Sequence, residues 1–237
     1  MEPLVVVGAL VAAGYILASS DTPVQEDRSK TLVDYYVQGG DLDTALGNGY
    51  RLIELHVYSD GQDQPVVALS PQYDGISARG FQACCIAILQ KAFPSKDPLI
   101  LSLVLHTDKS FTANRVAHHL TTTVRTHLFS GSIENIPLSE LADKVIIVCG
   151  NEARGTELEP LVNVSWNESH LRRLTYQQAA HPREPEELRS FTHSHIALVA
   201  PDQAFSKFKV MDDVYAYGCQ WNLCPTPLGR PGFISRT

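Results

Sequence analysis

The sequence lacks any run or stripe of basic residues. Its 237 residues include 19 Lys and Arg against 26 Asp and Glu, which gives a formal net charge of −7. Nucleic-acid binding needs a dense positive surface, and attraction to acidic lipid headgroups needs a polybasic patch. The composition therefore argues against both kinds of contact, and we expect no nucleic-acid partner.

The sequence also lacks the cysteine pattern of a disulfide framework or a zinc site. The five cysteines are an odd number, and Cys84, Cys85 and Cys149 lie in apolar segments. Cys219 and Cys224 do not have the spacing of zinc ligands and have no second pair. We therefore predict buried free thiols, which favour a reducing, cytosolic environment.

Charged side chains are absent from residues 3–20. As a helix, a run of this length would cover about 25 Å, slightly less than the core of a bilayer. A cleaved signal peptide usually begins with a basic segment, whereas only Glu2 and the terminal amine precede this run. We predict a hydrophobic helix that forms a transmembrane anchor over residues 1–20 and a charged linker over residues 21–30. A buried first strand or helix is the alternative.

The charges beside the predicted span indicate its orientation. Basic residues lie only on its C-terminal side, beginning with Arg28 and Lys30. The positive-inside bias then places the following domain on the cytosolic side of a membrane crossed once. Glycosylation at either of the two sequons, Asn163-Val-Ser and Asn167-Glu-Ser, would contradict that placement.

Residues 31–237 show alternating strand and helix patterns and no internal repeat, and we predict one domain. Such alternation implies a parallel sheet, and this number of units predicts an α/β, TIM-barrel-like fold. Residues 151–195 are polar and are predicted to form helices and loops. Helices are predicted over 41–50, 80–93 and 110–128, and strands over 51–58, 65–70, 98–107, 145–150, 195–201 and 217–224.

The stretch "RLIELHVYSDGQDQPVVALSP", residues 51–71, predicts strand, turn and strand. Alternation places Glu54 and His56 on one face of the first strand, and places Ser102 and His106 on one face of a later strand. If both faces point into a barrel, Glu54, His56 and His106 converge as a small metal or acid–base cluster. These three residues are the candidate site. The alternative is that they only satisfy one another by hydrogen bonds.

Two other histidine pairs in the sequence could act as metal ligands. His118 and His119 lie on a predicted helix, where partial exposure is expected. His193 and His195 would share one face of a predicted strand, but no third ligand is evident. We therefore interpret both pairs as structural.

Four segments appear in an order that resembles the catalytic barrel of phosphoinositide-specific phospholipase C. In that family, one segment reads G-C/Y-R-x-[IL]-E-L-D-x-W-D-G and leads to P-x-[IV]-x-H-G, and the last reads G-C-Q-[ML]-V-[AS]-L-N. The resemblance covers roughly residues 16–225 and implies a distorted β/α barrel without the accessory modules of the animal enzymes. The segments here are "ALGNGYRLIELHVYSDGQDQPVVALSP", "AFPSKDPLILSLVLHTD", "LSELADKVIIVCG" and "YGCQWNLC".

The resemblance also implies which catalytic residues are missing. The family uses two histidines for proton transfer and Ca²⁺ to activate the attacking hydroxyl. Here Asp21 stands at the first histidine, Thr22 at a calcium-binding asparagine, and Ser70 or Leu69 at the second histidine. Among the catalytic positions of the family, Glu54 and His106 are the two that survive.

The remaining ligand positions are also changed. On the same resemblance, His56 stands at the acid of E-L-D and Val104 at a glutamate. Val148 and Gly150 stand at two phosphate-binding lysines. Because Ca²⁺ prefers carboxylate and carbonyl oxygens, His56 and Val104 are poor replacements.

The resemblance and its losses together predict a catalytically inactive, membrane-tethered phospholipase-C-like domain without a cofactor. We expect it to act as a structural or docking protein with protein partners. A short span before such a domain also fits a membrane- or capsid-associated virion component of a large DNA virus. The alternative is a divergent phosphoric diester hydrolase that acts on phosphoinositides through a rebuilt site, for which Ca²⁺ would be the expected cofactor.

Overall fold

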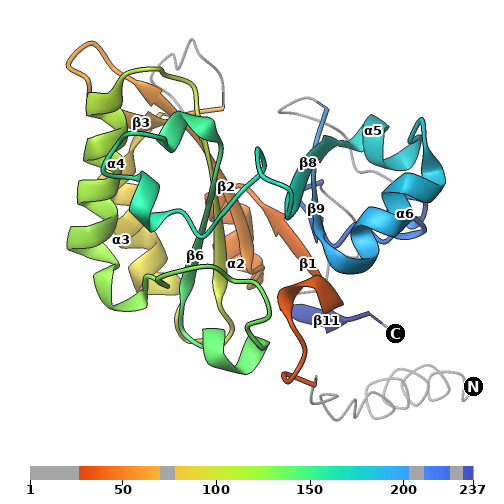
Figure 1. Cartoon of the computed structure of the whole chain (residues 1–237). Coiled ribbons are helices and arrows are strands. Elements are labelled where there is room, and N and C mark those ends of the chain that lie inside the picture. Colours follow the sequence, from red (N-terminus) through yellow and green to blue (C-terminus); the bar gives the residue numbers. More distant parts are fainter. Residues whose placement is uncertain (1–26, 70–77, 203–210, 225–231, 237) are drawn as a thin grey trace, which may run out of the picture.

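The computed structural model describes residues 27–69, 78–202, 211–224 and 232–236 (Figure 1). Within these ranges, no helix combines the length and the apolar character that a membrane crossing requires. The predicted anchor over residues 1–20 lies outside the described residues, and so does most of the predicted linker.

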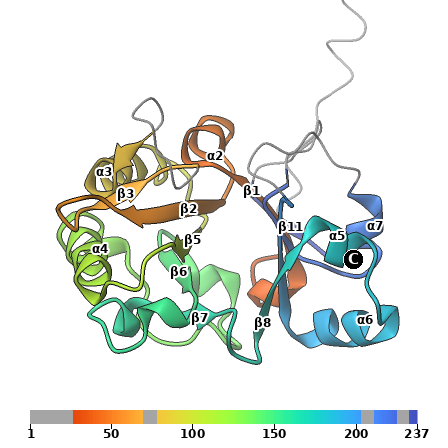
Figure 2. The same cartoon turned by 90° about the horizontal axis from the view of Figure 1, so that it is seen from above.

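Eight parallel strands form a nearly closed barrel, which confirms the predicted TIM-barrel-like class (Figure 2). Following the sheet, the order is β7-β6-β5-β2-β1-β10-β9-β8. Among the described residues no pairing joins β7 to β8, and we call this gap the seam. The strands are β1 (Tyr35–Gly40), β2 (Leu52–Ser59), β5 (Leu99–Leu105), β6 (Val145–Cys149), β7 (Val164–Ser165), β8 (Leu171–Thr175), β9 (Ile196–Ala200) and β10 (Trp221–Asn222).

Three short strands extend this sheet with antiparallel pairs. Strand β3 (Pro65–Val67) pairs with β2 across the predicted turn, and β4 (Arg79–Gly80) pairs with β3. Strand β11 (Phe233–Ser235) pairs with β1, so the end of the described chain lies beside its beginning.

Helices cover the outside of both halves of the barrel (Figure 1). The predicted helix over 41–50 is α2, which begins where the Asp41 side chain accepts hydrogen bonds from the backbone N–H groups of Asp43 and Thr44. It ends at Gly49, whose φ of 71° favours glycine. The helices are α2 (Leu42–Asn48), α3 (Phe81–Lys91), α4 (Ser110–Thr123), α5 (Tyr176–Ala180), α6 (Pro185–Ser194) and α7 (Asp212–Tyr215), with short 3₁₀ turns η1 (Leu32–Asp34), η2 (Arg125–His127), η3 (Leu138–Leu141), η4 (Asn151–Ala153) and η5 (Glu159–Leu161).

The apolar core lies on both faces of the strands. On β2, Ile53 and Leu55 point outward and pack against α3 and α4, whereas Leu52 points into the barrel. Inside, Leu52 packs with Tyr35 and Trp221, and all three side chains are fully buried. This alternation also directs Glu54 and His56 of the same strand toward the interior.

Two parts of the sequence-based assignment are wrong. Residues 151–195 were predicted to lack strands, yet they contain β7 and β8. Strand β7 has only two residues, and β8 carries the adjacent Arg172 and Arg173, so neither shows an apolar pattern. His193 and His195 do not share a strand face, because His193 lies in the last turn of α6 and His195 caps that helix.

Other expectations are confirmed. All five cysteines are buried and free. His118 is exposed and His119 half-buried on α4.

The two sequon asparagines differ in exposure. Asn167 is exposed, but Asn163 is buried. The Oδ1 atom of Asn163 accepts a hydrogen bond from Ile147 N at 2.7 Å, and its Nδ2 donates to two carbonyl oxygens. A glycan on Asn163 is therefore incompatible with this fold.

Candidate functional site

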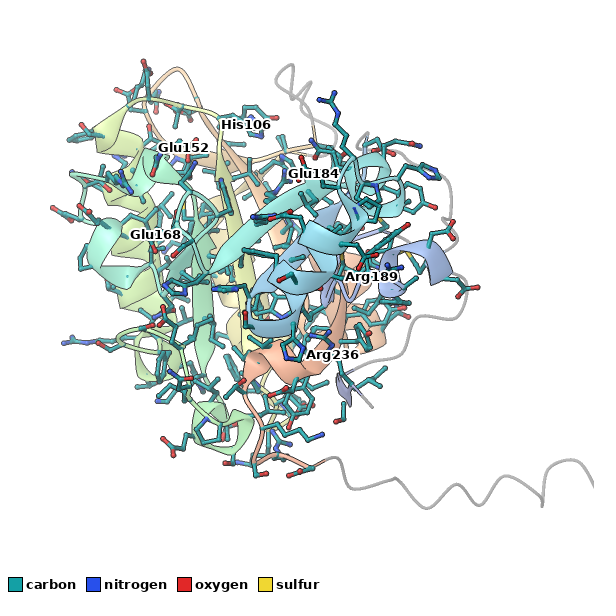
Figure 3. All side chains as sticks on the ribbon, turned by 45° about the vertical axis from the view of Figure 1, so that its right-hand side comes forward. His106, Glu152, Glu168, Glu184, Arg189 and Arg236 are labelled. Carbon is teal, nitrogen blue, oxygen red and sulfur yellow. The ribbon has the colours of Figure 1, made fainter. Side chains whose placement is uncertain are left out.

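His56 and His106 lie toward the carboxyl end of the parallel strands, which is the end where β/α barrels place their active sites, and Glu54 lies nearer the middle of β2. Glu54 and His56 come from β2, and His106 follows β5. The structure brings these three residues together, as the alternation pattern predicts. Figure 3 shows His106 and Glu152 at this end of the barrel and Arg236 near the opposite end.

Glu54 forms an ion pair across the interior of the barrel. Arg173 of β8 donates to Glu54 Oε1 at 2.7 Å and to Oε2 at 3.3 Å. Ser102 of β5 donates its hydroxyl to Oε2 at 3.0 Å. The Glu54 side chain is only 7% exposed. Because β2 and β8 lie in halves that meet at the seam, this ion pair connects the two halves of the barrel.

The surroundings of Glu54 favour its charged form. Burial raises the pKa of this carboxyl, but the hydrogen bond from His56 and the charge of Arg173 outweigh burial and lower the pKa to about 2. Glu54 is therefore ionised at neutral pH and has little capacity to accept a proton.

The two histidines continue from Glu54 as a chain of contacts. His56 Nε2 lies 3.2 Å from Glu54 Oε1, and His56 Nδ1 lies 2.8 Å from His106 Nε2. The ring of His106 also stacks on Tyr58 at 4.4 Å between centroids. Burial, followed by the nearby charges of His56 and Arg173, lowers the pKa of His106. The arrangement can hold a proton on the two imidazoles, with the Glu54 carboxylate orienting His56.

The arrangement does not fit a metal ion. His56 directs one nitrogen to Glu54 and the other to His106, so one ion could not bind all three side chains without rearrangement. In the described part of the chain, no group of three or more His, Cys, Asp or Glu residues is arranged to hold a metal. Ca²⁺ in particular needs several oxygen ligands, and the oxygens of Glu54 are already bonded to Arg173 and Ser102.

The surroundings of the two positions that the resemblance assigns to phosphate-binding lysines are arranged around the residues present here. Val148 is fully buried among the apolar residues of the interior. A Cβ atom on Gly150 would lie 2.2 Å from Glu152 Oε2 and 2.8 Å from Trp166 Nε1. Adding a side chain at Gly150 would therefore displace at least the Glu152 carboxylate. Asp21, Thr22 and Ser70 lie outside the described residues.

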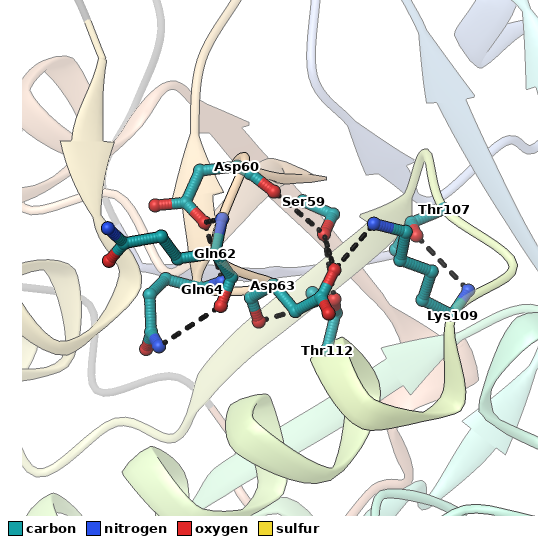
Figure 4. Close-up of polar contacts among 8 residues, drawn as sticks. All are labelled: Ser59, Asp60, Gln62, Asp63, Gln64, Thr107, Lys109 and Thr112. Carbon is teal, nitrogen blue, oxygen red and sulfur yellow. Dashed lines mark hydrogen bonds and ion pairs between the residues drawn. The ribbon is translucent and has the colours of Figure 1, made fainter.

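A network of polar contacts holds the rim beside His106 (Figure 4). Asp63, at the turn between β2 and β3, pairs with Lys109, which follows His106 on the way to α4. The Thr112 hydroxyl on α4 donates to Ser59 Oγ at 3.0 Å. Asp60 accepts backbone hydrogen bonds that close the turn. These contacts fix the end of β2 against the end of β5, where His56 and His106 meet.

A pocket of about 420 Å³ lies beside His56. Its polar walls are Asp41, which caps α2, Asp43 of α2 and Arg79 of β4, with Glu54 and His56 along one side. Arg79 pairs with Asp43 at 3.0 Å. The pocket therefore presents acidic groups, one paired arginine and an imidazole.

Sequence reasoning missed three polar residues that the structure shows to be important. One is Arg173, described above. Arg51 is 3% exposed and donates to the carbonyl oxygens of Ala92, Asp97 and Pro98 at 2.6–3.1 Å. The third is Gln220. The signal that could have revealed Arg51 and Gln220 is that both are polar residues inside otherwise apolar strand patterns.

Gln220 is fully buried and connects three backbone groups. Its Oε1 accepts from Ala197 N at 2.9 Å, and its Nε2 donates to the carbonyl oxygens of Thr192 and His195 at 2.8 and 2.9 Å. Gln220 thus fixes the end of α6 to the start of β9.

Comparisons with known proteins identify what this barrel resembles. The family described as phosphatidylinositol-specific phospholipase C, X domain, matches residues 14–149, and the match begins inside the apolar run of residues 3–20. No curated protein sequence gives a significant match.

Solved structures show the same fold at low sequence identity. PLC21 of S. officinalis gives a TM-score of 0.69 at 15% identity over 84% of this chain, which spans only 34% of that protein's length. A calcium-dependent phosphoinositol-specific phospholipase C from Pseudomonas sp. gives 0.60 at 12% identity, covering 83% of this chain and 90% of the enzyme. The phosphatidylinositol-specific phospholipase C of Listeria monocytogenes gives 0.54 at 10% identity, covering 86% and 92%.

Proposed function

This chain belongs to the phosphatidylinositol-specific phospholipase C family through an X domain, and from that premise we propose that it is a catalytically inactive member that acts as a structural or docking protein. The family fold is that of phosphoric diester hydrolases.

One contrast carries the proposal: two family-motif residues that this chain retains bind backbone, whereas on the resemblance most of those that it lacks are catalytic or ligand residues. Arg51 of the G-C/Y-R motif and Gln220 of the G-C-Q motif each bond three backbone groups. The lysine positions are instead Val148 and Gly150. Such a pattern supports retention of the fold without the reaction.

The retained carboxylate also supports the proposal. Glu54 is engaged by Arg173, Ser102 and His56, so it is not available to a cation. A general acid or base contributes about 10²–10⁴-fold to a rate. Loss of both family histidines, together with the calcium ligands and the lysines, would remove several such factors at once.

A second candidate is favoured by one observation, the continuous chain from Glu54 through His56 to His106. A carboxylate that orients an imidazole is a common arrangement in acid–base catalysis. If this chain serves a rebuilt site, the protein is a divergent phosphoric diester hydrolase of phosphoinositides. We favour the inactive form because two basic groups beside this chain of contacts, Arg173 and Lys109, are already paired with Glu54 and Asp63.

The test is turnover of phosphatidylinositol vesicles with millimolar Ca²⁺, with the Pseudomonas enzyme as the positive control. We expect no turnover above buffer and no rise in melting temperature on adding Ca²⁺, because a ligand that binds only the folded state must stabilise it. Turnover that disappears in the His56→Asn and His106→Asn variants, with melting temperatures unchanged, would instead establish the second candidate.

We further propose that residues 3–20 tether this domain to a membrane, with the barrel on the cytosolic side. Eight parallel strands are found within the described residues, which supports an anchor over a further core strand for residues 3–20. A tethered, inactive barrel would present its surface to protein partners, and a virion membrane or capsid is one setting that it fits.

Deletion of residues 1–20 tests the tether. We expect the shortened chain to show a cooperative thermal transition and to remain in the supernatant after carbonate extraction, whereas the full chain should sediment with membranes. A shortened chain that aggregates without a melting transition would return these residues to the core, because a barrel that loses a strand exposes an edge.

A further inference from the structure

The described chain begins at the amino end of the barrel. Residues 27–31 lead into η1 and then into β1. Figure 1 shows β11, which pairs with the start of β1, at the lower end of the barrel, and β3, which pairs with the end of β2, at the upper end. The chain therefore enters the barrel at the end opposite to His56 and His106.

Contacts to three parts of the amino end hold this entry in place. The carbonyl oxygens of Arg28 and Lys30 accept hydrogen bonds from backbone N–H groups of η3 at 3.0 and 2.8 Å. Arg28 also pairs with Asp97, just before β5, at 2.8 Å, and Lys30 Nζ donates to Ser235 Oγ on β11 at 3.1 Å. The point at which the chain enters the barrel is therefore fixed.

The residues before Asp27 limit how far this entry can lie from a membrane. If residues 3–20 cross the bilayer, residues 20–27 connect its core to the barrel, and a chain of this length spans at most about 24 Å. The headgroup layer outside the core takes about 5–7 Å of that length. Asp27 can therefore lie at most about 18 Å above the headgroups.

The barrel is taller than this reach. Strand β2 has 8 residues, which correspond to about 26 Å of strand and, at a tilt of about 36°, to about 21 Å along the barrel axis. The turn after β2 and the entry segment before β1 lie beyond the ends of the strands and add to this height. The carboxyl end is therefore farther from Asp27 than Asp27 can be from the headgroups.

We propose that the amino end of the barrel is the membrane-facing surface of this protein, and that the carboxyl end faces away from the bilayer in which residues 3–20 lie. This orientation rests on the proposed tether and is independent of whether catalysis has been lost. The pocket of about 420 Å³ beside His56 is then out of reach of the lipids of that bilayer. A ligand of this pocket must arrive from the aqueous side.

The charge of the carboxyl end favours the same orientation. The cytosolic leaflet is anionic, and its potential acts within about 10 Å of the surface. Arg79 and Lys109 are each paired with an acid, so they leave the excess of acid at this end uncompensated. The turns and helix starts that follow β1, β2 and β5 carry Asp41, Asp43, Asp60, Asp63 and Asp108. An anionic surface would therefore repel this end of the barrel.

The amino end has a different balance of charge. Acidic side chains such as Asp97 and Asp143 lie there among basic ones. The basic residues are Arg28, Lys30, Lys91, Lys96, Arg125 and Lys144. An anionic leaflet would not repel an end with this mixture of charges. Because the tether supplies the attachment, the orientation requires no polybasic patch.

The experiment measures energy transfer from a dye at either end of the barrel to acceptor-labelled lipid headgroups. The full chain is reconstituted in vesicles of phosphatidylcholine and phosphatidylserine with acceptors in the outer leaflet. A membrane-impermeant maleimide dye then labels Ser139→Cys, on η3 at the amino end, or Gln62→Cys, in the turn after β2, and both positions are exposed. The five native cysteines are buried, and the chain without an added cysteine measures the background labelling.

We expect the full chain to float with the vesicles. The distance to the acceptor layer should be shorter for Ser139→Cys than for Gln62→Cys by about 20 Å, which is the height of the strands. Arg125→Cys on η2 and Asp108→Cys after β5 repeat the comparison at a second pair of exposed positions. The second pair decides the result if a variant of the first pair has a lowered melting temperature.

Two results would overturn the orientation and leave the tether intact: flotation with equal transfer from both ends, or flotation with stronger transfer from the carboxyl end. A full chain that does not float with the vesicles would overturn the tether itself, and the orientation with it. Flotation and energy transfer therefore separate failure of the proposed function from failure of this inference.

Discussion

Replacing Arg51 with methionine is expected to lower the free energy of unfolding by about 3–5 kcal/mol, because a buried charged donor would be lost and its acceptors left unpaired. The guanidinium donates to Ala92 O at 2.7 Å, Asp97 O at 2.6 Å and Pro98 O at 3.1 Å. These carbonyls end α3 and lead into β5, so the change would loosen the strand that carries Ser102 and is followed by His106. Chemical denaturation of both chains measures the difference.

Arg125→Met is the matched control, because Arg125 is exposed on η2. We expect that change to alter stability by less than about 0.5 kcal/mol, as is usual for surface substitutions. Equal effects of the two substitutions would show that the three backbone contacts of Arg51 contribute little. The comparison therefore separates loss of a buried hydrogen-bond donor from the general effect of removing a positive charge.

Much of the first half of the barrel could be predicted because its local signals agree with the fold. Asp41 before an apolar pattern predicts the start of α2, and the "SDGQDQ" turn predicts the connection between β2 and β3. The apolar run "LILSLVL" is typical of a strand buried on both faces, and β5 is such a strand. These features follow from residues near one another in the sequence.

The strands that are short, polar or rich in glycine were harder to predict. Strand β1, "YYVQGG", ends in two glycines and was not identified. In β8, Arg173 points into the barrel toward a carboxylate 119 positions earlier in the chain. A charged residue on an inward face contradicts the apolar pattern unless its partner is known, and sequence spacing does not reveal a partner at that separation.

The candidate site shows the same division. Alternation along β2 and β5 was sufficient to bring Glu54, His56 and His106 to one end of the barrel, because adjacent parallel strands keep their inward faces aligned. The order in which these side chains contact one another could not be predicted from the sequence. Only the structure shows that Arg173 takes one side of Glu54 and His56 takes the other.

The ion pair between Glu54 and Arg173 is expected to show strong coupling in a double-mutant cycle. Arg173→Met should cost about 3–5 kcal/mol, because it leaves the Glu54 carboxylate buried without its counter-charge. Glu54→Met should cost less, about 1–3 kcal/mol, because Arg173 is 25% exposed and its guanidinium can turn toward water. The double variant should return to within about 1–2 kcal/mol of the wild type, since apolar residues often replace a buried ion pair without loss.

The pH dependence gives the cycle a second readout. The pKa of Glu54 is lowered from 4.5 to about 2, so its contribution to stability is fully present above pH 4.5 and is lost as the pH falls toward 2. The double variant should lack this acid-sensitive component.

Arg172→Met is the matched control, because Arg172 lies on the same strand but pairs with Glu187 on the exposed outer face. An ion pair at such a surface contributes about 0–1 kcal/mol to stability. If Arg172→Met and Arg173→Met cost the same, the ion pair across the barrel does not hold its two halves together. A large cost for Arg173→Met that Glu54→Met relieves would show that it does.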